Sequence, residues 1–216
     1  MNKLERFNEL KNFDKQYNFQ YIAGIDEAGR GPLAGPVVAA AAILPLDCDI
    51  VGIDDSKKLS EPKRNILFDE IMKNAVSVGL GMCDEKIIDE INILQATFWA
   101  MKRAVDALNI TPGCLLIDGN KIIPGNISGD GFPTQISIVK GDSKSLSIAA
   151  AGIIAKVTRD RIMKNYGKDY PNYSFAKHKG YPTKAHYEEI TRSGTCDIHR
   201  KSFLLRWKLK IANGEK

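Results

Sequence analysis

The chain has 216 residues, of which 44% are hydrophobic and 26% are charged. These values are ordinary for a globular protein, so we expect a packed core and a single main domain. No apolar stretch approaches the roughly 18 residues of a membrane-spanning helix, and the charged N-terminus lacks the apolar core of a signal peptide. We therefore expect a cytoplasmic protein without a membrane contact.

The basic residues gather toward the C-terminus. Residues 161–216 carry 13 lysines and arginines against 5 acidic residues, whereas the first 160 residues carry 18 against 21. A basic final quarter on a nearly neutral body is typical of a protein that binds a polyanion. Charge alone also permits a solvated basic helix.

The four cysteines are scattered, at Cys48, Cys83, Cys114 and Cys196. Their spacing matches neither a zinc site nor a disulfide framework, so we expect buried free thiols. The histidines, at His178, His186 and His199, also lack ligand spacing, and no catalytic role is assigned to them.

The N-terminal quarter predicts one helix and two strands. An apolar residue recurs every three positions, at Leu4, Phe7, Leu10 and Phe13. This stripe predicts an amphipathic helix within residues 1–19. Residues 19–26 then predict a strand, residues 29–36 a turn because five of the eight are glycine or proline, and residues 37–44 a buried strand.

The middle of the chain alternates helices with strands. Ser60, followed by glutamate and proline, predicts a helix start. Residues 75–82 predict a strand, and Asn92 is expected to cap a helix that ends near residue 108. Two further strands follow at residues 114–118 and 134–139.

The last third is expected to be helical. We predict a long helix over residues 143–166 and two shorter ones over 184–191 and 202–211. The predicted class is α/β with a mixed sheet. We divide the chain into an N-terminal helix (1–19), a catalytic core (20–168) and a basic C-terminal helical segment (169–216).

The segment Gly24–Gly31 partly matches a phosphate-binding P-loop, which requires lysine and serine or threonine at its end. Arg30 and Gly31 stand in those places, Pro32 opposes a following helix, and two carboxylates inside the loop would repel phosphate. We therefore exclude a nucleotide-binding loop.

Asp26 and Glu27 lie at the expected end of the first strand, and Asp118 ends the strand at residues 114–118. Carboxylates at the carboxyl ends of strands suit a hard divalent cation. Because side chains alternate along a strand, Asp26 and Glu27 share one site only if the strand ends or twists there. A solvated turn for the pair and an ordinary polar strand end for Asp118 remain alternatives.

Asp142 precedes the long helix, where aspartate is a normal N-cap, although capping does not exclude a ligand role. Together, four carboxylates at element ends and a basic tail indicate a metal-assisted phosphodiesterase. Two ions about 3.5–4 Å apart can activate a water and stabilise the leaving oxygen.

Ten motifs run in the order typical of one family: Gly24–Gly31, Gly35–Ala39, Asp55–Ser60, Asn92–Ala96, Ile117–Gly119, Lys140–Ser143, Ile148–Ala151, Ala155–Asp160, Lys179–Thr183 and His199–Phe203. With them the chain resembles the ribonuclease HII family over residues 20–205. The resemblance implies a ribonuclease H-like mixed sheet flanked by helices, with a C-terminal helical segment.

The resemblance also implies an activity and a site. The implied enzyme is a monomeric endoribonuclease that uses Mg²⁺ or Mn²⁺, cuts RNA–DNA hybrids and DNA duplexes containing ribonucleotides, and leaves 5′-phosphate and 3′-hydroxyl ends. Its implied metal ligands are Asp26, Glu27, Asp118 and Asp142. The implied substrate contacts are Gly29, Arg30 and Gly31 at the ribose 2′-hydroxyl, Tyr181 at the deoxyribose, and Lys57 and Asn92 at phosphates.

One departure from the family is Gly152, because the family usually has serine between the flanking alanine and isoleucine. Only about 19 residues precede the first expected strand, which disfavours the related type 3 enzymes with their extra N-terminal domain. A non-catalytic nucleic-acid-binding module and a small-molecule phosphatase are the alternative functions. The first would not need the carboxylates, and the second would not need the basic tail.

Overall fold

The computed structural model describes residues 2–125 and 133–205. At its centre is a five-stranded sheet in the order β3-β2-β1-β4-β5. The strands are β1 (Ile22–Ala28), β2 (Val37–Ile43), β3 (Ser77–Cys83), β4 (Cys114–Asp118) and β5 (Thr134–Ile138). β1, β2 and β3 are antiparallel neighbours, whereas β4 and β5 run parallel to β1. The sheet is therefore mixed, as predicted.

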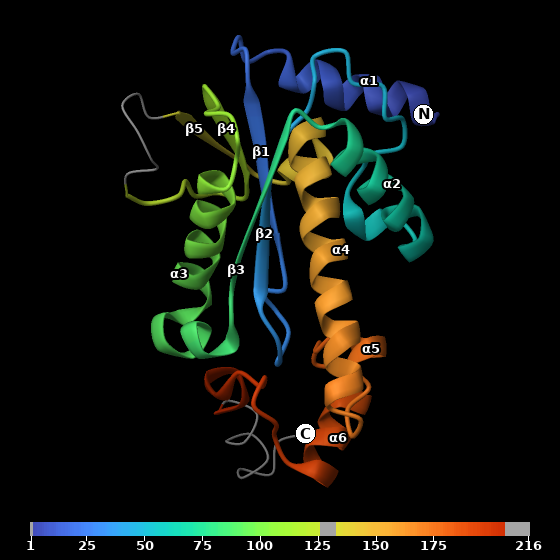
Figure 1. Cartoon of the computed structure of the whole chain (residues 1–216), viewed down its shortest axis with the longest axis vertical. Coiled ribbons are helices and arrows are strands. Elements are labelled where there is room, and N and C mark those ends of the chain that lie inside the picture. Colours follow the sequence, from blue (N-terminus) through green and yellow to red (C-terminus); the bar gives the residue numbers. More distant parts are fainter. Residues whose placement is uncertain (1, 126–132, 206–216) are drawn as a thin grey trace.

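The named α-helices around this sheet and at its ends are α1 (Lys3–Asp14), α2 (Glu61–Asn74), α3 (Glu85–Asp106), α4 (Leu146–Asp169), α5 (Phe175–His178) and α6 (Lys184–Ser193). Two short 3₁₀ turns are η1 (Ser56–Lys58) and η2 (Gly141–Ser143). α3 and α4 lie on opposite sides of the sheet, α1 crosses one end, and α5 and α6 lie at the other (Figure 1). None of the helices described is long and apolar enough to cross a membrane.

β2 explains how two helices approach the sheet so closely. All seven of its residues are buried, and its centre is a run of alanines. Ala40 and Ala42 belong to the core on the α4 side, while Ala39 and Ala41 belong to the core on the α3 side. Small side chains on both faces of β2 let the backbones of α3 and α4 come near the sheet.

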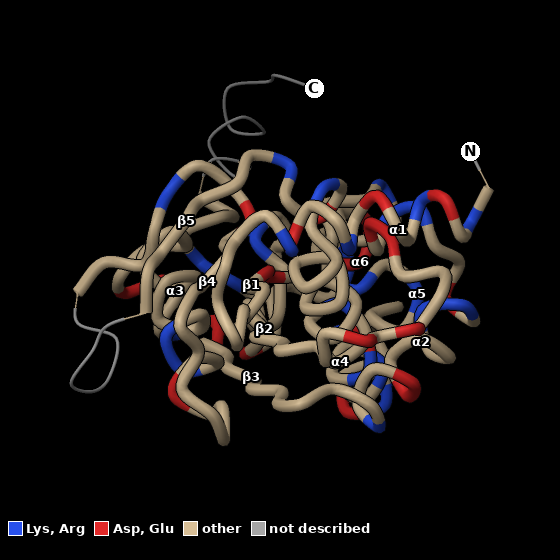
Figure 2. Tube along the Cα trace, turned by 90° about the horizontal axis from the view of Figure 1, so that it is seen from above, with Lys and Arg blue, Asp and Glu red and all other residues tan. Residues whose placement is uncertain are grey.

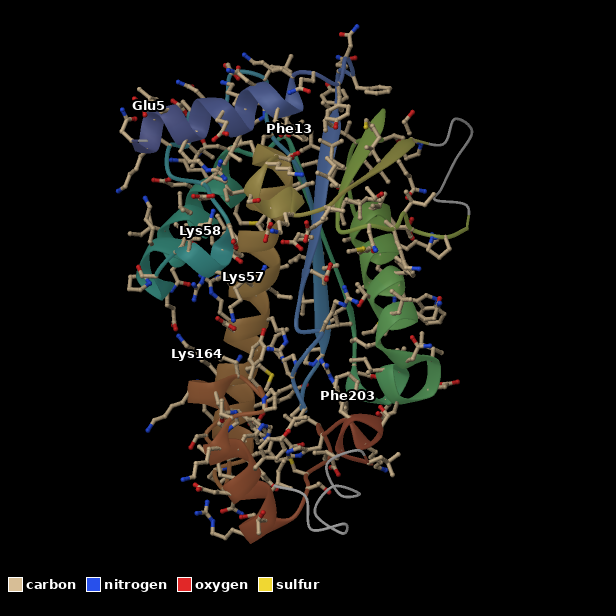
Figure 3. All side chains as sticks on the ribbon, turned by 180° about the vertical axis from the view of Figure 1, so that it is seen from behind. Glu5, Phe13, Lys57, Lys58, Lys164 and Phe203 are labelled. Carbon is tan, nitrogen blue, oxygen red and sulfur yellow. The ribbon has the colours of Figure 1, made fainter. Side chains whose placement is uncertain are left out.

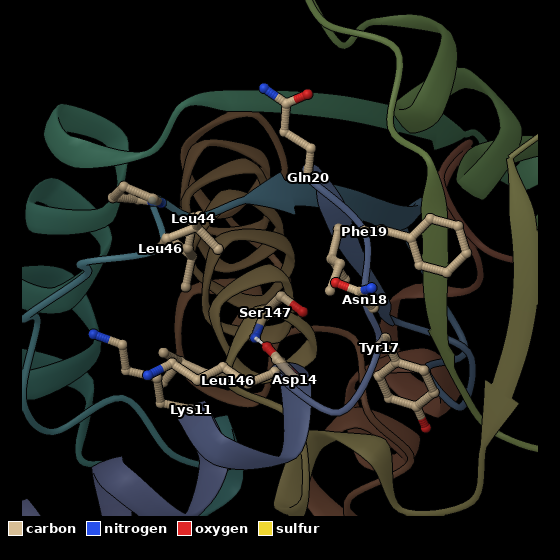
Figure 4. A pocket seen from close by; sticks show the side chains of 13 residues that line it. Lys11, Asp14, Tyr17, Asn18, Phe19, Gln20, Leu44, Leu46, Leu146 and Ser147 are labelled. Carbon is tan, nitrogen blue, oxygen red and sulfur yellow. Dashed lines mark hydrogen bonds between the residues drawn. The ribbon is translucent and has the colours of Figure 1, made fainter.

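α1 is tied to the start of α4 (Figure 4). Asp14 at the end of α1 accepts a 2.8 Å hydrogen bond from the backbone N–H of Ser147, so its carboxylate caps a helix distant in sequence. A hollow of about 410 Å³ lies beside this contact and is lined in part by Phe19 and Leu46.

The C-terminal segment has a small core of its own. Tyr173, Phe175, Ile190 and Leu204 pack there with Leu33, which comes from the loop after β1. Residues 201–205 are helical. The predicted helix over residues 202–211 thus lies partly in the described residues, and its part beyond residue 205 lies outside them.

Several predicted boundaries are wrong by a few residues. β1 begins at Ile22 instead of residue 19, and α4 begins at Leu146 instead of residue 143. Ser60 precedes α2 as predicted, but its side chain makes no capping hydrogen bond. α3 begins at Glu85, seven residues before Asn92, because Asp84 caps about two additional turns.

The cysteines are free thiols, as predicted: Cys48, Cys83 and Cys114 are buried, and Cys196 is half-buried.

Candidate active site

Three carboxylates from separate elements converge at one edge of the sheet. Asp26 lies near the end of β1, Asp118 ends β4, and Asp142 lies in η2. Parallel pairing of Ile25 with Ile117 brings the first two to the same edge. One oxygen of each carboxylate lies within 4.8 Å of the others. The structure therefore brings together three of the four carboxylates singled out in the sequence.

Asp26 is buried, with only 6% of its surface exposed. Its Oδ1 accepts a 2.7 Å hydrogen bond from the backbone N–H of Glu27. A Cβ placed on Gly152 of α4 would lie 2.4 Å from Asp26 Oδ2. The Asp26 carboxylate can therefore occupy its present position only because residue 152 has no side chain. Burial, and then the charges of Glu27 and Asp118, raise the pKa of Asp26 well above its ordinary value.

Asp118 joins β4 to η2. Its Oδ1 accepts a 2.6 Å hydrogen bond from the backbone N–H of Gly141. Burial, followed by the negative charge of Asp142, raises the pKa of Asp118. The pKa values of Asp26 and Asp118 thus rise for the same two reasons, desolvation and neighbouring negative charge.

Asp142 does not cap the long helix, which was the alternative to a ligand role. Ser145 is the cap of α4, and its Oγ accepts a 3.2 Å hydrogen bond from the backbone N–H of Ile148. Asp142 instead accepts a 3.0 Å hydrogen bond from Lys57 Nζ. Desolvation lowers the pKa of Lys57, but the hydrogen bond and charge of Asp142 outweigh it and raise this pKa to about 12. A charged ammonium therefore lies beside Asp142 of the cluster; Figure 3 labels Lys57, which carries it.

Glu27 faces the other side of β1. The strand continues through Glu27 to Ala28, so the two adjacent acids alternate across it. Glu27 lines a hollow of about 210 Å³ together with Asp118 and Phe98. It also pairs with Arg30 at 3.3 Å. Because Asp118 borders both the hollow and the cluster, Glu27 is a neighbour of the three convergent carboxylates.

The donor set fits a hard divalent cation. Oxygen ligands from Asp26, Asp118 and Asp142 are those that Mg²⁺ and Mn²⁺ prefer. The raised pKa values of Asp26 and Asp118 indicate that ionising these neighbouring carboxylates costs free energy. A bound cation would remove this cost, because it favours the ionised carboxylates. Figure 2 shows the molecule along its long axis, with acidic and basic positions interspersed over the trace.

The segment of Gly29, Arg30 and Gly31 follows β1 directly. Gly29 has a φ of 101°, and a Cβ there would lie 2.1 Å from Arg159 Nε, so only glycine fits. A Cβ on Gly31 would meet nothing within 4 Å. The loop is thus packed against the protein at Gly29 and open to solvent at Gly31.

Tyr181 lies next to this loop, in a second loop. The residue is 38% exposed, and the cationic groups of Lys156 and Arg159 lie 5.7 and 5.8 Å from its ring centroid. The preceding residue, Gly180, accepts a 2.8 Å hydrogen bond from the backbone N–H of Leu33. The predicted exposed aromatic is therefore present and adjoins the glycine-rich loop.

Asn92 has a local structural role. It is exposed, its φ of 68° interrupts α3, and its Oδ1 accepts hydrogen bonds from the backbone N–H groups of Leu94 and Gln95 at 3.0 and 3.2 Å. It therefore caps the second part of α3, as the sequence predicts. The structure does not place it among the convergent carboxylates.

The three histidines, to which no role was assigned, pack beneath the Tyr181 loop. His186 Nδ1 lies 3.0 Å from the carbonyl oxygen of Tyr181, so this nitrogen carries the proton. Its Nε2 then accepts a 3.1 Å hydrogen bond from His199 Nε2. His178 stacks on His186 with 4.3 Å between ring centroids, and its Nε2 lies 2.9 Å from a carboxylate oxygen of Glu189. These contacts position the loop.

Two buried arginines were also missed. Arg159 and Arg200 are both 0% exposed. Arg159 donates hydrogen bonds of 2.9 to 3.0 Å to the carbonyl oxygens of Ala34, Pro36 and Lys179. Both arginines belong to motifs that carry the family resemblance, which was a usable signal. The location of Arg200 in the basic C-terminal quarter instead suggested a solvent-exposed surface.

The comparisons with known proteins agree on one family. The family model described as Ribonuclease HII matches residues 23–208. A protein from Acetivibrio thermocellus named ribonuclease HII is 57% identical over 204 residues, which cover 93% of this chain and 77% of the relative. A protein of the same name from Geotalea uraniireducens is 56% identical over 195 residues, covering 90% and 88%.

Solved structures show the same fold. The ribonuclease H2 from Pyrococcus horikoshii OT3 superposes with a TM-score of 0.70 at 28% identity, over 91% of this chain and 100% of that one. A ribonuclease HIII in complex with Mn²⁺ (Bst-RNase HIII) reaches a TM-score of 0.67 at 20% identity, over 94% and 73% of the two chains, and shows likeness of fold alone. Since the family model and the relatives both span most of the sequence, the chain belongs to the ribonuclease HII family and is a ribonuclease H, a hydrolytic endoribonuclease of RNA–DNA hybrids.

Proposed function

We propose that this ribonuclease hydrolyses its substrates at the cluster of Asp26, Asp118 and Asp142. The observation that carries the proposal is the convergence of three oxygen donors within 4.8 Å from three separate elements. Water adds to the phosphorus, and the bond from phosphorus to the 3′-oxygen breaks. The products are a 5′-phosphate and a 3′-hydroxyl, both within RNA–DNA hybrids and at single ribonucleotides in duplex DNA.

Asp26, Asp118 and Asp142 would hold Mg²⁺ or Mn²⁺, with Glu27 as a fourth ligand from the adjoining hollow and two ions as the full complement. When bound, the ions supply Lewis acidity, an activated water and neutralisation of the developing charge. The carboxylates serve as ligands and do not attack the phosphorus. Lys57 balances the charge of Asp142 and presents an ammonium toward the path of a phosphate.

Substrate recognition is proposed for the two adjoining loops. Gly29, Arg30 and Gly31 would approach the ribose 2′-hydroxyl through their backbone, which the open side at Gly31 supports. Tyr181 would stack on the deoxyribose next to the cut. Asn92, exposed on α3, is proposed to contact a more distant phosphate.

The oligomeric state, the division of the chain and its location in the cell are also proposed. We propose a monomer divided into residues 1–19, a catalytic core of 20–168 and a basic segment of 169–216. The packing of the C-terminal aromatic residues in one cluster, which Leu33 and Met163 join from the core segment, supports this division. The relatives are bacterial, and bacterial DNA lies in the cytoplasm, where we propose that the enzyme acts.

The test is to incubate the protein with a DNA duplex that contains one ribonucleotide, with Mg²⁺ or Mn²⁺ or with a chelator, and to map the product ends. We expect metal-dependent incision that leaves the two ends named above. Binding without incision would support the alternative, a non-catalytic nucleic-acid-binding module.

Asp118→Asn is the matched variant for this test. We expect cleavage to fall by about a thousandfold, because metal ligation contributes several kcal/mol and about 1.4 kcal/mol corresponds to tenfold in rate. The melting temperature should not fall, because loss of one negative charge relieves the repulsion that raises the pKa values of the cluster. Near-normal cleavage by the folded variant would remove Asp118 from the site.

A further inference from the structure

The loop after β1 is held from within by an arginine that lies far away in sequence. The guanidinium of Arg200 donates four hydrogen bonds to three carbonyl groups: to Gly35 at 3.0 and 2.7 Å, to Arg30 at 3.0 Å and to Gly29 at 2.6 Å. The backbone N–H of Arg200 also donates a 2.8 Å hydrogen bond to the carbonyl oxygen of Leu33. One residue of the C-terminal segment thus contacts the backbone of residues 29–35 along its length.

The burial of Arg200 is unusual because carboxylates do not neutralise it. In the described part of the chain its guanidinium forms no ion pair, and Glu85 and Asp89 act on it only at longer range. Desolvation lowers the pKa of Arg200 to about 9. A buried cation is costly unless hydrogen bonds satisfy it, and here the loop carbonyl groups do so. The loop and the arginine therefore stabilise each other in one arrangement.

The loop needs such support. Gly29 and Gly35 both have positive φ values, of 101° and 81°, and glycine loses more conformational freedom on folding than other residues. Arg200 bonds the carbonyl groups of both glycines, while Gly31 between them faces open space. The anchored and the open parts of the loop are therefore separated by one or two residues.

We propose that Arg200 is a positioning residue of the cleavage reaction, which holds residues 29–31 in the backbone shape that recognises a ribose. The inference rests on the recognition role proposed above for Gly29, Arg30 and Gly31. A planar guanidinium can bond several carbonyl groups at fixed angles, whereas the ammonium of lysine is a compact charge without that geometry. Arg200 touches neither substrate nor metal ligand in this role, and it acts through the loop.

The experiment compares two dissociation constants, for an all-DNA duplex and for the same duplex with one ribonucleotide. Full-length protein is used with Ca²⁺ in place of Mg²⁺, so that duplex binding is measured. Ca²⁺ is larger than Mg²⁺ and has a flexible coordination instead of the octahedral geometry of Mg²⁺. For the wild type we expect tighter binding of the ribonucleotide duplex. Arg200→Lys should reduce this preference by about tenfold and leave binding of the all-DNA duplex unchanged. A residue that merely stabilised the fold would not change the ratio in protein that is fully folded at the assay temperature.

The matched control is Arg192→Lys, an exposed arginine of α6 in the same C-terminal segment, which should keep the wild-type ratio. If Arg200→Lys does not fold, Arg200→Gln replaces it, because a neutral amide keeps a donor without burying a charge. A folded Arg200 variant with the wild-type ratio would overturn the inference. A wild type that binds both duplexes equally would instead refute the proposed role of the loop, which keeps the two failures distinct.

Discussion

At the scale of single residues, Gly152 determines where Asp26 can lie. An added Cβ would contact Asp26 Oδ2 at 2.4 Å but Asp26 Cβ only at 3.7 Å, so the carboxylate can rotate away without displacement of α4. We therefore expect Gly152→Ala to fold, with a gain of up to about 1 kcal/mol in helix stability. The concentration of Mg²⁺ that gives half-maximal cleavage should rise several-fold.

The measurement is a Mg²⁺ titration of the cleavage rate, together with a melting curve. Gly167→Ala is the control, since it lies in the same helix but faces Ala176 instead of a carboxylate. An unchanged Mg²⁺ dependence for Gly152→Ala would show that Asp26 tolerates the extra methyl group.

A second single-residue change, at Tyr181, tests how the enzyme recognises a single ribonucleotide. Tyr181→Ala should slow incision at a single ribonucleotide about tenfold or more, because stacking contributes ~1–3 kcal/mol. Cleavage within a continuous RNA strand should be less affected, since no deoxyribose follows the cut there. The ratio of the two rates is the measured quantity. Phe19→Ala is a matched control, because Phe19 is 37% exposed against 38% for Tyr181 and lies in a different hollow. An equal loss on both substrates would make Tyr181 merely structural.

At the scale of elements, the histidines link α5, α6 and residue 199 beneath the Tyr181 loop. Desolvation, followed by the charge of His178, lowers the pKa of His186 from 6.5 to about 4. The unfolded chain therefore binds this proton more readily than the folded chain does. The stabilising contribution of neutral His186 is complete above about pH 6.5 and is lost as the pH falls toward 4.

We expect the melting temperature of the wild type to fall over this pH range more steeply than that of His186→Asn, which cannot take up the proton. The difference between the two curves is compared because the raised pKa values of Asp26 and Asp118 act in the opposite direction in both proteins. Parallel curves from pH 7.5 to 4.5 would exclude His186 as the titrating group.

At the scale of the whole molecule, the basic C-terminal segment should make binding depend on salt. Residues 206–216 add four basic residues and one acidic residue to the chain. Their deletion keeps Leu204, which is buried in the C-terminal core. The slope of log affinity against log salt should become shallower by about 0.9 for each phosphate that the shortened chain no longer neutralises. An unchanged slope in the folded truncation would indicate that these charges lie away from the substrate.

The sequence by itself determined the class of fold and the family, and it singled out the three carboxylates that converge in the structure together with Glu27, which lies beside them. Alternating and helical hydrophobic patterns are local, and so are capping residues such as Asn92, so they can be interpreted without knowledge of contacts. The motifs predicted a metal site at strand ends because the carboxyl ends of parallel strands share one edge of a sheet. The helix predicted from residue 143 begins three residues later, at Leu146, because Gly141–Ser143 form a separate 3₁₀ turn.

Only the tertiary structure decided which side chains meet and which are buried. Asp26 and Glu27 are adjacent in sequence yet face opposite sides of β1, whereas Asp142 joins the cluster from more than a hundred residues away. Arg200 belongs to the basic C-terminal segment, which suggests a surface, yet Arg200 and Arg159 are both buried against the backbone of residues 29–36. Burial of a charge depends on carbonyl groups brought near by the whole fold, and such long-range contacts leave no periodic signal in the sequence.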